Sequence, residues 1–323
     1  MAHPKYSIIV PVYNRPEELR ELLQSLAAQS YQNFEVVVVE DGSTLTSDSV
    51  VSEFSKLSIR YFIKPNTGPG PSRNFGFEKA IGDYFVVFDS DCILPPSYFE
   101  VVEKFLKEQP IDAWGGPDRG HEKFTTLQQA MAYTMSSVFT TGGIRGSKKS
   151  IGNFQPRSFN MGLSRQAYEK TNGFRCDRFA EDIELSVRMK KLGLLVGLIP
   201  EAFVYHKRRA TLAQFFKQVF NFGRGRVLVG NQHPGEVKWV HWFPLAYTFG
   251  LMAMPICYFI NYILFAFALS CYLIYSLLIF ADGLSTTRSL VVALLTIPSS
   301  IVQLTGYGLG FLTQQVKFLQ AKW

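Results

Sequence analysis

The stretch YFVVFDSD at residues 84–91 decides the fold of the first two thirds of the chain. Its five apolar or aromatic residues in a row predict a strand that is buried on both faces and ends at Asp89 and Asp91. Residues two apart in an extended chain point to the same side, so these two carboxylates can converge on one divalent cation. Taken alone, the same letters also fit a solvated turn or a helix N-cap before Pro95.

A divalent cation at this place indicates a phosphate-bearing partner. Mg²⁺ and Mn²⁺ prefer oxygen ligands and usually complete their coordination with phosphate oxygens. Asp89 and Asp91 therefore predict Mg²⁺ or Mn²⁺ as cofactor and a nucleotide diphosphate as partner.

Further apolar runs predict parallel strands at residues 6–12, 34–39 and 59–63. A helix is expected to open at Pro16, with Asn14 or Arg15 at its cap position. Strand, helix and strand in succession are typical of a mostly parallel α/β sheet with helices on both faces. Ligands of such sheets bind beyond the carboxyl ends of the strands. The residues expected to face that crevice are Tyr13, Glu40, Asp41, Arg73, Asp89 and Asp91.

The four motifs PVYN (11–14), EDGS (40–43), NTGPGPSRNFG (66–76) and FDSD (88–91) resemble, in order and spacing, those of the family 2 glycosyltransferases. The resemblance implies a GT-A fold and an inverting enzyme that uses a nucleotide-diphosphate sugar. By this resemblance Tyr13 and Glu40 would contact the base or ribose, Arg73 the diphosphate, Asp89 the ribose or metal, and Asp91 the metal. Pro11 and Asp41 would belong to the same donor pocket. The family usually has Asp where this chain has Glu40.

The segment FAEDIELSVRMKKLG at residues 179–193 predicts a helix with Glu181 and Asp182 in its first turn. Acids in a first turn ordinarily serve as caps. The resemblance adds another role, because the E-D motif of the family lies at this place and its Asp is the general base. Asp182 would then be the catalytic residue, and Asn160 would contact the donor sugar or shape the acceptor pocket.

An apolar strand predicted at 194–204 leads to His206 and three cations. His206 is either structural or close to a phosphate or the metal. A basic, glycine-rich loop at 142–152 is either a lid over phosphate or a solvated surface loop.

The last part of the chain has the apolar composition that is expected of membrane-spanning segments. Residues 243–281 contain no charged side chain and predict two crossings that turn near Pro255 to Asn261. Residues 289–312, also uncharged, predict a third segment broken by Pro298 and Gly306 to Gly310. Cations on both sides of the apolar runs argue for an even number of crossings.

The chain of 323 residues is therefore expected to have three parts: a cytosolic catalytic domain at 1–210, an amphipathic interface helix and linker at 211–240, and a membrane domain of two to four segments at 241–323. No cleaved signal peptide is expected. The four cysteines show no disulfide or metal spacing. The net charge of +7 gathers near the membrane segments, which favours anionic lipid over nucleic acid as partner.

These patterns predict a multi-pass protein of the cytoplasmic membrane that transfers a sugar, with inversion, to a lipid-linked acceptor in cell-surface polysaccharide or glycolipid synthesis. The Q-x-x-R-W signature of processive polysaccharide synthases is absent. The alternatives are a polyprenyl-phosphate glycosyltransferase and a catalytically silent membrane scaffold.

Overall fold

The computed structural model describes residues 3–119, 124–141, 154–206 and 210–320. The loop predicted at 142–152 lies outside these residues. The chain divides into two compact units, of which the first holds residues 1–121 and 149–207 and the second holds 122–148 and 208–323. Residues 122–148 fall within the predicted first domain but belong to the second unit, and among the described ones Met131 joins an apolar cluster with Phe215 and Val219.

In the described part of the first unit, seven strands form one sheet in the order β3-β2-β1-β4-β8-β6-β9. Every pair is parallel except for β8, which runs antiparallel to β4 and β6. The predicted mostly parallel α/β sheet is confirmed. The strands of this sheet are β1 (Tyr6–Val12), β2 (Phe34–Asp41), β3 (Ile59–Lys64), β4 (Tyr84–Phe88), β6 (Ala113–Gly115), β8 (Asn160–Ser164) and β9 (Val196–Leu198).

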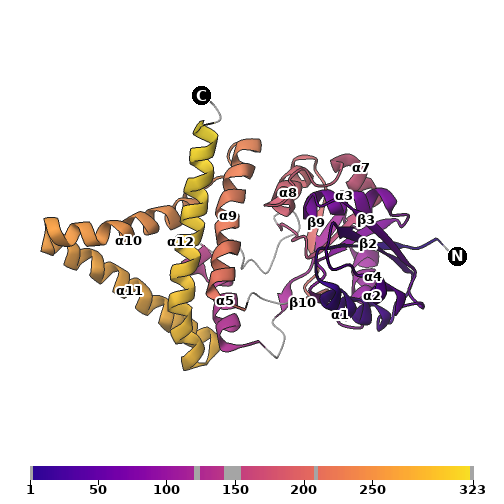
Figure 1. Ribbon diagram of the computed structural model, residues 1–323, viewed down its shortest axis with the longest axis horizontal. Helices are drawn as coiled ribbons and strands as arrows, with labels where there is room; N and C mark the ends of the chain where they lie inside the picture. Colours follow the sequence, from indigo (N-terminus) through magenta and orange to yellow (C-terminus); the bar gives the residue numbers. More distant parts are fainter. Residues whose placement is uncertain (1–2, 120–123, 142–153, 207–209, 321–323) are drawn as a thin grey trace. The chain divides into compact units, whose positions relative to one another are not determined.

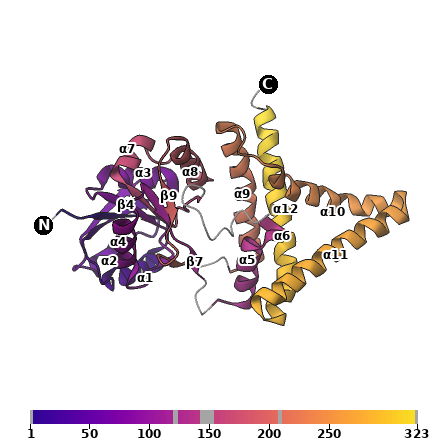
Figure 2. The same cartoon turned by 180° about the vertical axis from the view of Figure 1, so that it is seen from behind.

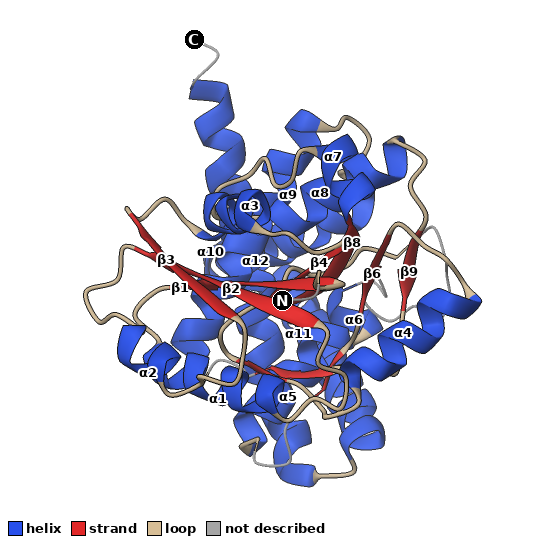
Figure 3. Ribbon diagram, turned by 90° about the vertical axis from the view of Figure 1, so that its right-hand side faces the viewer, coloured by secondary structure: helices blue, strands red, loops and turns tan. Residues whose placement is uncertain are grey.

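Helices cover both faces of this sheet (Figure 3). On one face α1 (Pro16–Ala27) and α4 (Tyr98–Glu108) pack on alternate strand residues such as Ile8 and Val36. On the other face α3 (Pro69–Lys79), α7 (Arg165–Thr171) and α8 (Glu181–Lys191) pack on Ile9 and Phe85. A short helix, α2 (Asp48–Ser52), follows β2. Because both faces of β1, β2 and β4 are buried, these strands consist almost wholly of apolar residues.

A second sheet, three-stranded as far as the described residues show, has the order β5-β10-β7. Its strands are β5 (Cys92–Ile93), β7 (Asp118–Arg119) and β10 (Val204–His206). The single strand predicted at 194–204 is therefore wrong, since β9 and β10 belong to different sheets. The turn at 200–202 separates the two strands.

The second unit is helical (Figures 1 and 2). Its helices are α5 (Thr126–Ser136), α6 (Val138–Thr141), α9 (Leu212–Gln232), the 3-10 turn η1 (Trp239–His241), α10 (Phe243–Ile260), α11 (Tyr262–Thr287) and α12 (Leu290–Gln320). By length and composition, three helical segments in the described part could span a membrane, namely 239–260, 262–287 and 290–320.

The predicted turn after residue 255 is confirmed, because α10 ends at Ile260 and α11 begins at Tyr262. The predicted break in the third segment is wrong, because α12 continues through Pro298 and the glycines. These glycines allow close helix contact instead. A Cβ at Gly306 would lie 2.7 Å from a Val219 methyl, and one at Gly308 would lie 2.5 Å from the Pro244 carbonyl oxygen.

Candidate functional site

The carboxyl ends of β1, β2 and β4 bring the predicted donor-site residues to one edge of the sheet. Pro11 lies in register with Val39 on β2, and Tyr13 follows β1 with 51% of its surface exposed. Glu40 and Asp41 end β2. Asp89 and Asp91 follow β4, which pairs with β1 in parallel. The exposed Tyr13 ring is free to stack on a planar ligand group.

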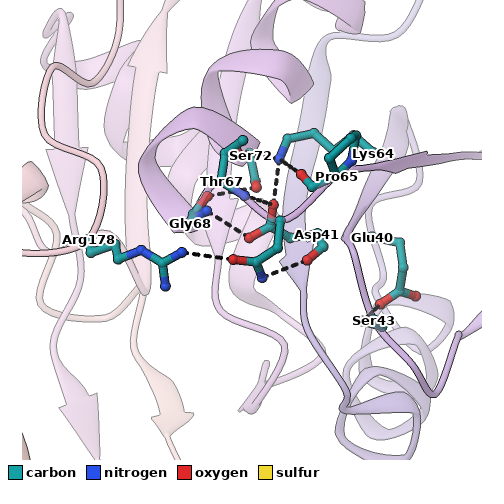
Figure 4. A network of polar contacts seen from close by, with 10 residues as sticks. Glu40, Asp41, Ser43, Lys64, Pro65, Thr67, Gly68, Ser72 and Arg178 are labelled. Atoms are coloured by element: carbon teal, nitrogen blue, oxygen red, sulfur yellow. Dashed lines mark hydrogen bonds and ion pairs between the residues drawn. The ribbon is translucent and has the colours of Figure 1, made fainter.

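The Asp41 carboxylate organises the loop between β3 and α3 (Figure 4). It accepts hydrogen bonds from the backbone N–H groups of Thr67 and Gly68, both at 2.9 Å, and pairs with the Lys64 ammonium. The backbone carbonyl of Asp41 accepts a further bond from the Asn66 amide at 2.8 Å. Burial by itself raises the pKa of this carboxyl, but Lys64 and the two N–H groups outweigh burial and hold the pKa below its usual range.

This arrangement predicts a pH-dependent contribution of Asp41 to stability. A depressed folded-state pKa stabilises the fold above the unfolded-state value of about 3.9 and loses that effect as pH falls through the folded-state pKa. Asp41→Asn should lower the thermal unfolding midpoint at pH 7, by about 1–3 kcal/mol of stability. The gap from the unmodified protein should narrow below about pH 4.

Asp83→Asn is the matched control, because the Asp83 side chain is 61% exposed in its pair with His3 and should contribute little. A gap for Asp41→Asn that stays the same from pH 7 to pH 3 would contradict the assigned ion pair.

Glu40 lies deeper than a ligand-binding side chain is expected to lie. It is 0% exposed, and its carboxylate accepts bonds from the Tyr61 hydroxyl at 2.8 Å, the Ser47 N–H at 2.9 Å and the Ser43 hydroxyl. The extra methylene of Glu relative to Asp lets this carboxylate reach the loop after β2. Its contact with the base or ribose stays a prediction, and its visible role is to hold residues 43–47.

The glycine-rich stretch before α3 packs against another part of the chain. A Cβ at Gly70 would lie 2.1 Å from the Cys176 carbonyl oxygen, and the Gly70 N–H donates to the Asp177 carbonyl at 3.0 Å. Gly68 has φ of +102°, and a Cβ there would lie 2.9 Å from the Asp177 carbonyl oxygen. The Arg178 guanidinium donates to the Asn66 side chain at 2.8 Å (Figure 4). Residues 176–178 therefore lie against these glycines.

Arg73 joins the end of β4 to the start of α8. Its guanidinium, 3% exposed, donates from Nη2 to the Asp89 carboxylate at 2.8 Å and from Nη1 to the Glu181 carboxylate at 2.9 Å. It also lies 5.4 Å from the centre of the Phe174 ring. Burial opposes the charge, but Asp89 and Glu181 raise the pKa of Arg73 above its usual value. Arg73 therefore bridges two motifs, and its predicted diphosphate contact stays untested.

Arg15 pairs with the second acid of the β4 motif. Its Nη1 donates to the Asp91 carboxylate at 2.7 Å, with 38% of the Arg15 side chain exposed. Arg15 does not cap α1 through its side chain. Asn14, with φ of 54°, accepts bonds instead from the N–H groups of Thr44 and Leu45 at 2.8 and 3.0 Å. Arg15 is the N-cap residue of α1, as predicted, but its side chain makes no cap bond because it reaches across the sheet edge to Asp91.

Asp182 begins α8 beside the Arg73 bridge. Its carboxylate accepts a bond from the Ile183 N–H at 2.8 Å and lies 3.5 Å from an Arg157 guanidinium nitrogen. The side chain is 16% exposed. Burial, with the nearby Asp182 charge, raises the pKa of Glu181 although Arg73 opposes the shift. The bond from a first-turn N–H fits a cap, and a partly exposed carboxylate fits a base, so both interpretations of Asp182 stand.

Asn160 and His206 lie at the far side of β4. Asn160 is 0% exposed, accepts from the Tyr98 hydroxyl at 2.6 Å and donates to the Ala202 carbonyl at 2.8 Å. Both ends of its amide are thus bonded within the protein, which fits the shaping of a pocket better than direct sugar contact. The backbone of His206 pairs with Cys92, one residue beyond Asp91.

The acids at this edge suit a metal that a ligand helps to hold. In the described part of the chain, no group of three or more His, Cys, Asp and Glu residues could hold a metal ion by itself. Mg²⁺ and Mn²⁺ bound with nucleotides need only one or two carboxylates, because phosphate oxygens and water fill the other positions. Asp91 and Asp89 fit that mode, provided that the exposed Arg15 side chain moves away from Asp91.

Arg15, Arg157 and Glu181 belong to this site but were not predicted from the sequence as site residues. Arg15 is 76 residues from its partner Asp91, and Arg73 is 108 residues from Glu181. Glu181 lies in the E-D motif and Arg15 directly follows PVYN, but neither spacing nor periodicity indicates which acid each arginine meets.

Residues 7–171, just over half of the chain, match the family described as Glycosyl transferase family 2. An uncharacterized glycosyltransferase of Rickettsia felis is 40% identical over 105 residues, which are 32% of this chain and 17% of that protein. The chain therefore spans about a sixth of the length of that relative. A probable glycosyltransferase of Bacillus subtilis, YdaM, is 26% identical over 238 residues, covering 70% of this chain and 56% of that protein.

Among solved structures, the mannosyltransferase PcManGT from Pyrobaculum calidifontis, in complex with GDP-Man and Mn²⁺, superposes with a TM-score of 0.69. The superposition covers 98% of this chain and 88% of that one at 15% sequence identity. This likeness in fold extends beyond residues 7–171 into the helical unit.

Proposed function

The chain belongs to glycosyl transferase family 2, and from this premise we propose that it is a membrane-bound, metal-dependent inverting glycosyltransferase. The donor is a nucleotide-diphosphate sugar, and the acceptor is a lipid-linked molecule of cell-surface polysaccharide or glycolipid assembly at the cytoplasmic membrane. The observation that carries the proposal is the pair of salt bridges that Arg73 makes with Asp89 and Glu181. Because Asp182 follows Glu181 in α8, these salt bridges support a common site for Asp182 and the donor-side acids.

The roles follow from the charges at the sheet edge. An inverting transfer needs a base on the face of the sugar opposite the leaving diphosphate. Asp182 takes that role, since its carboxylate lies at the start of α8, while Asp91 belongs to the loop after β4. A metal held by Asp91 and Asp89 would neutralise the charge that develops on the leaving group. The exposed Tyr13 and the end of β2 suit the base and ribose.

The apolar composition of the candidate spans supports a lipid-linked acceptor. The three candidate spans in the described residues contain long apolar stretches, and few of their side chains are buried within 239–260 and 262–287. Relatives in the solved structures bind GDP-Man with Mn²⁺ or, for TarS residues 1–349 of S. aureus, UDP-GlcNAc. These ligands are the first donors to test with this chain.

The proposal is tested by a panel of nucleotide sugars on the full chain in nanodiscs. A ligand that binds the folded state raises the unfolding midpoint, by about 2.7 kcal/mol of stability at a hundred times its Kd. At least one nucleotide sugar should stabilise the protein with Mn²⁺ and much less with EDTA. Metal-dependent hydrolysis of that sugar would argue against a silent scaffold. Stabilisation by no member of the panel would contradict the proposal.

Asp91→Asn is expected to weaken binding of both Mn²⁺ and the donor, because the cation bridges the carboxylate and the diphosphate. Arg15→Gln is the matched comparison. It removes the cation that now pairs with Asp91 at 2.7 Å and should strengthen Mn²⁺ binding to the nucleotide-free protein. Electron paramagnetic resonance of Mn²⁺ measures both changes without any turnover. Equal Mn²⁺ affinity in Asp91→Asn and the unmodified protein would remove Asp91 from the metal site.

A further inference from the structure

We propose that α10 and α11 are the two membrane-crossing helices, and that α12, the third candidate span, lies along the membrane surface. Both ends of the helical unit then stay on the same side of the bilayer. This inference rests on the proposed membrane association and adds its topology. The partner of α12 is the lipid boundary between headgroups and acyl chains.

The α10–α11 hairpin has the length and composition of two spans. At 1.5 Å per residue, the 18 residues of α10 measure about 27 Å, close to the hydrocarbon thickness of about 30 Å. Trp239 and Trp242 are exposed just before α10, and Tyr258 and Tyr262 are exposed at its far end. Two aromatic groups separated by one bilayer thickness are typical of the two membrane interfaces.

The hairpin tip and the far end of α11 also fit two membrane crossings. The Asn261 side chain at the tip accepts bonds from the N–H groups of Ile263 and Leu264, at 2.9 and 3.2 Å, so the turn caps its own helix. Residues 262–281 are uncharged, and Asp282 follows them as the sole acid after Glu236 in the sequence. Asp282 accepts bonds from the Tyr133 and Ser137 hydroxyls of the α5 region. These polar contacts mark the point where α11 leaves the hydrocarbon.

α12 differs from α10 and α11 because the cationic helix α9 packs along it. Gly306, Gly310 and Gly223 let α9 approach closely, since a Cβ at Gly310 would lie 1.9 Å from the Phe220 carbonyl oxygen. The Arg224 guanidinium donates to the Gln314 side chain at 3.2 Å. Figures 1 and 2 show α9 and α12 side by side along most of α9.

The cations of α9 exclude α12 from the hydrocarbon core. A span needs about 20 residues, and every such window in the uncharged stretch 289–316 contains Gly306. Val219 packs on Gly306, and the exposed Lys217 lies two residues before it. If α12 crossed the membrane, α9 would carry the exposed Lys217 into lipid and the half-buried Arg224 to the depth of the hydrocarbon, where charged side chains are costly.

The directions of the helices support the same conclusion. α10 and α11 project away from α12 and converge at their tip, whereas α12 runs across their bases (Figure 1). Helices that run across one another in this way cannot all follow the bilayer normal. Since α10 and α11 are the more exposed, with 17% and 6% of their windows buried against 44% for α12, they are the pair that crosses.

The outer side of α12 suits a lipid surface. Leu290, Leu294, Ile301 and Val316 are exposed and recur at helical spacing, which makes an apolar stripe along the helix. With the cationic α9 on its other side, the α9–α12 pair is amphipathic in the manner of helices that lie at membrane interfaces.

The test measures the depth of nitroxide spin labels in nanodiscs, from the accessibility of each label to oxygen and to a water-soluble nickel complex. Cys257 and Cys271 are replaced by Ser, and the buried Cys92 and Cys176 are kept. Labels go on exposed positions of α12 (Leu290, Ile301, Val316) and of α11 (Leu264, Leu273, Leu284). The α12 labels should show one shallow depth, while the α11 labels should be deepest at 273.

Each other outcome has a distinct meaning. A depth maximum at residue 301 shows that α12 spans and overturns this inference. Immobile α12 labels that neither reagent reaches show that a second copy covers the stripe, which overturns the lipid partner. Full nickel accessibility at residue 273 instead overturns the proposed membrane association itself.

The side of each end gives an independent check. Asn231→Cys in the last turn of α9 and Gln320→Cys at the end of α12 should both react with a membrane-impermeant maleimide from the same side of sealed vesicles. Reaction of the two cysteines from opposite sides would mean an odd number of crossings and would overturn the topology.

Discussion

Asp182→Asn should lower sugar transfer by about 10² to 10⁴, the contribution that a general base typically makes. Asn keeps the size of Asp and much of its capping ability, so the start of α8 should survive. Donor and Mn²⁺ affinity should stay close to those of the unmodified protein. Single-turnover transfer and donor titration, measured on the same preparation, separate the two effects.

Asp91→Asn is the comparison variant, because it should lose metal and donor binding, whereas Asp182→Asn should lose transfer and keep binding. If Asp182→Asn also loses metal-dependent donor binding, Asp182 belongs to the donor site. If it transfers sugar at nearly the normal rate and binds normally, Asp182 is only a cap. A lipid phosphate needs no strong base, so that second result would also favour a polyprenyl-phosphate acceptor.

Arg73→Met should destabilise the first unit more than any other single substitution considered above. Removing one partner of a buried ion pair typically costs about 3–5 kcal/mol. The lower end of that range is expected here, because the Asp89 side chain is 33% exposed and can be solvated, whereas Glu181 at 11% cannot. The shift of the thermal unfolding midpoint of the full chain measures the effect.

Arg20→Met is the matched control, since Arg20 pairs with Glu53 at 2.8 Å and the two side chains are 29% and 46% exposed, so the carboxylate that remains can be solvated. The double variant Arg73→Met with Glu181→Gln should regain part of the loss, because no unpaired Glu181 charge is then buried. An Arg73→Met protein of normal stability that binds the donor poorly would show that Arg73 serves mainly the diphosphate.

Acid should also relieve the Arg73→Met defect. The pKa of Glu181 is already raised by burial in the presence of Arg73, and loss of that cation raises it further. A raised carboxyl pKa destabilises the fold above the unfolded value of about 4.3, and the penalty disappears as the group takes up a proton. The gap between Arg73→Met and the unmodified protein should therefore narrow from pH 7 towards pH 5.

The sequence by itself determined the elements whose physics is local. Unbroken apolar runs favour strands buried on both faces or long apolar helices, so β1, β2, β4 and the hairpin of α10 and α11 were predictable from 6–12, 34–39, 84–88 and 243–281. The acids at the carboxyl ends of β2 and β4 could be placed at one edge of the sheet, because parallel strands end there together.

Only the tertiary structure decided which partner each charged side chain meets. The Arg15 side chain reaches Asp91 from the cap position of α1, and Arg73 reaches Glu181 across 108 residues, because strand register and helix packing set those distances. The same holds for glycine. Gly70 and Gly306 look like loop and breaker residues in the sequence, yet each lacks a side chain because another segment lies against it. A residue's neighbours in space are a property of the whole fold, and no local pattern records them.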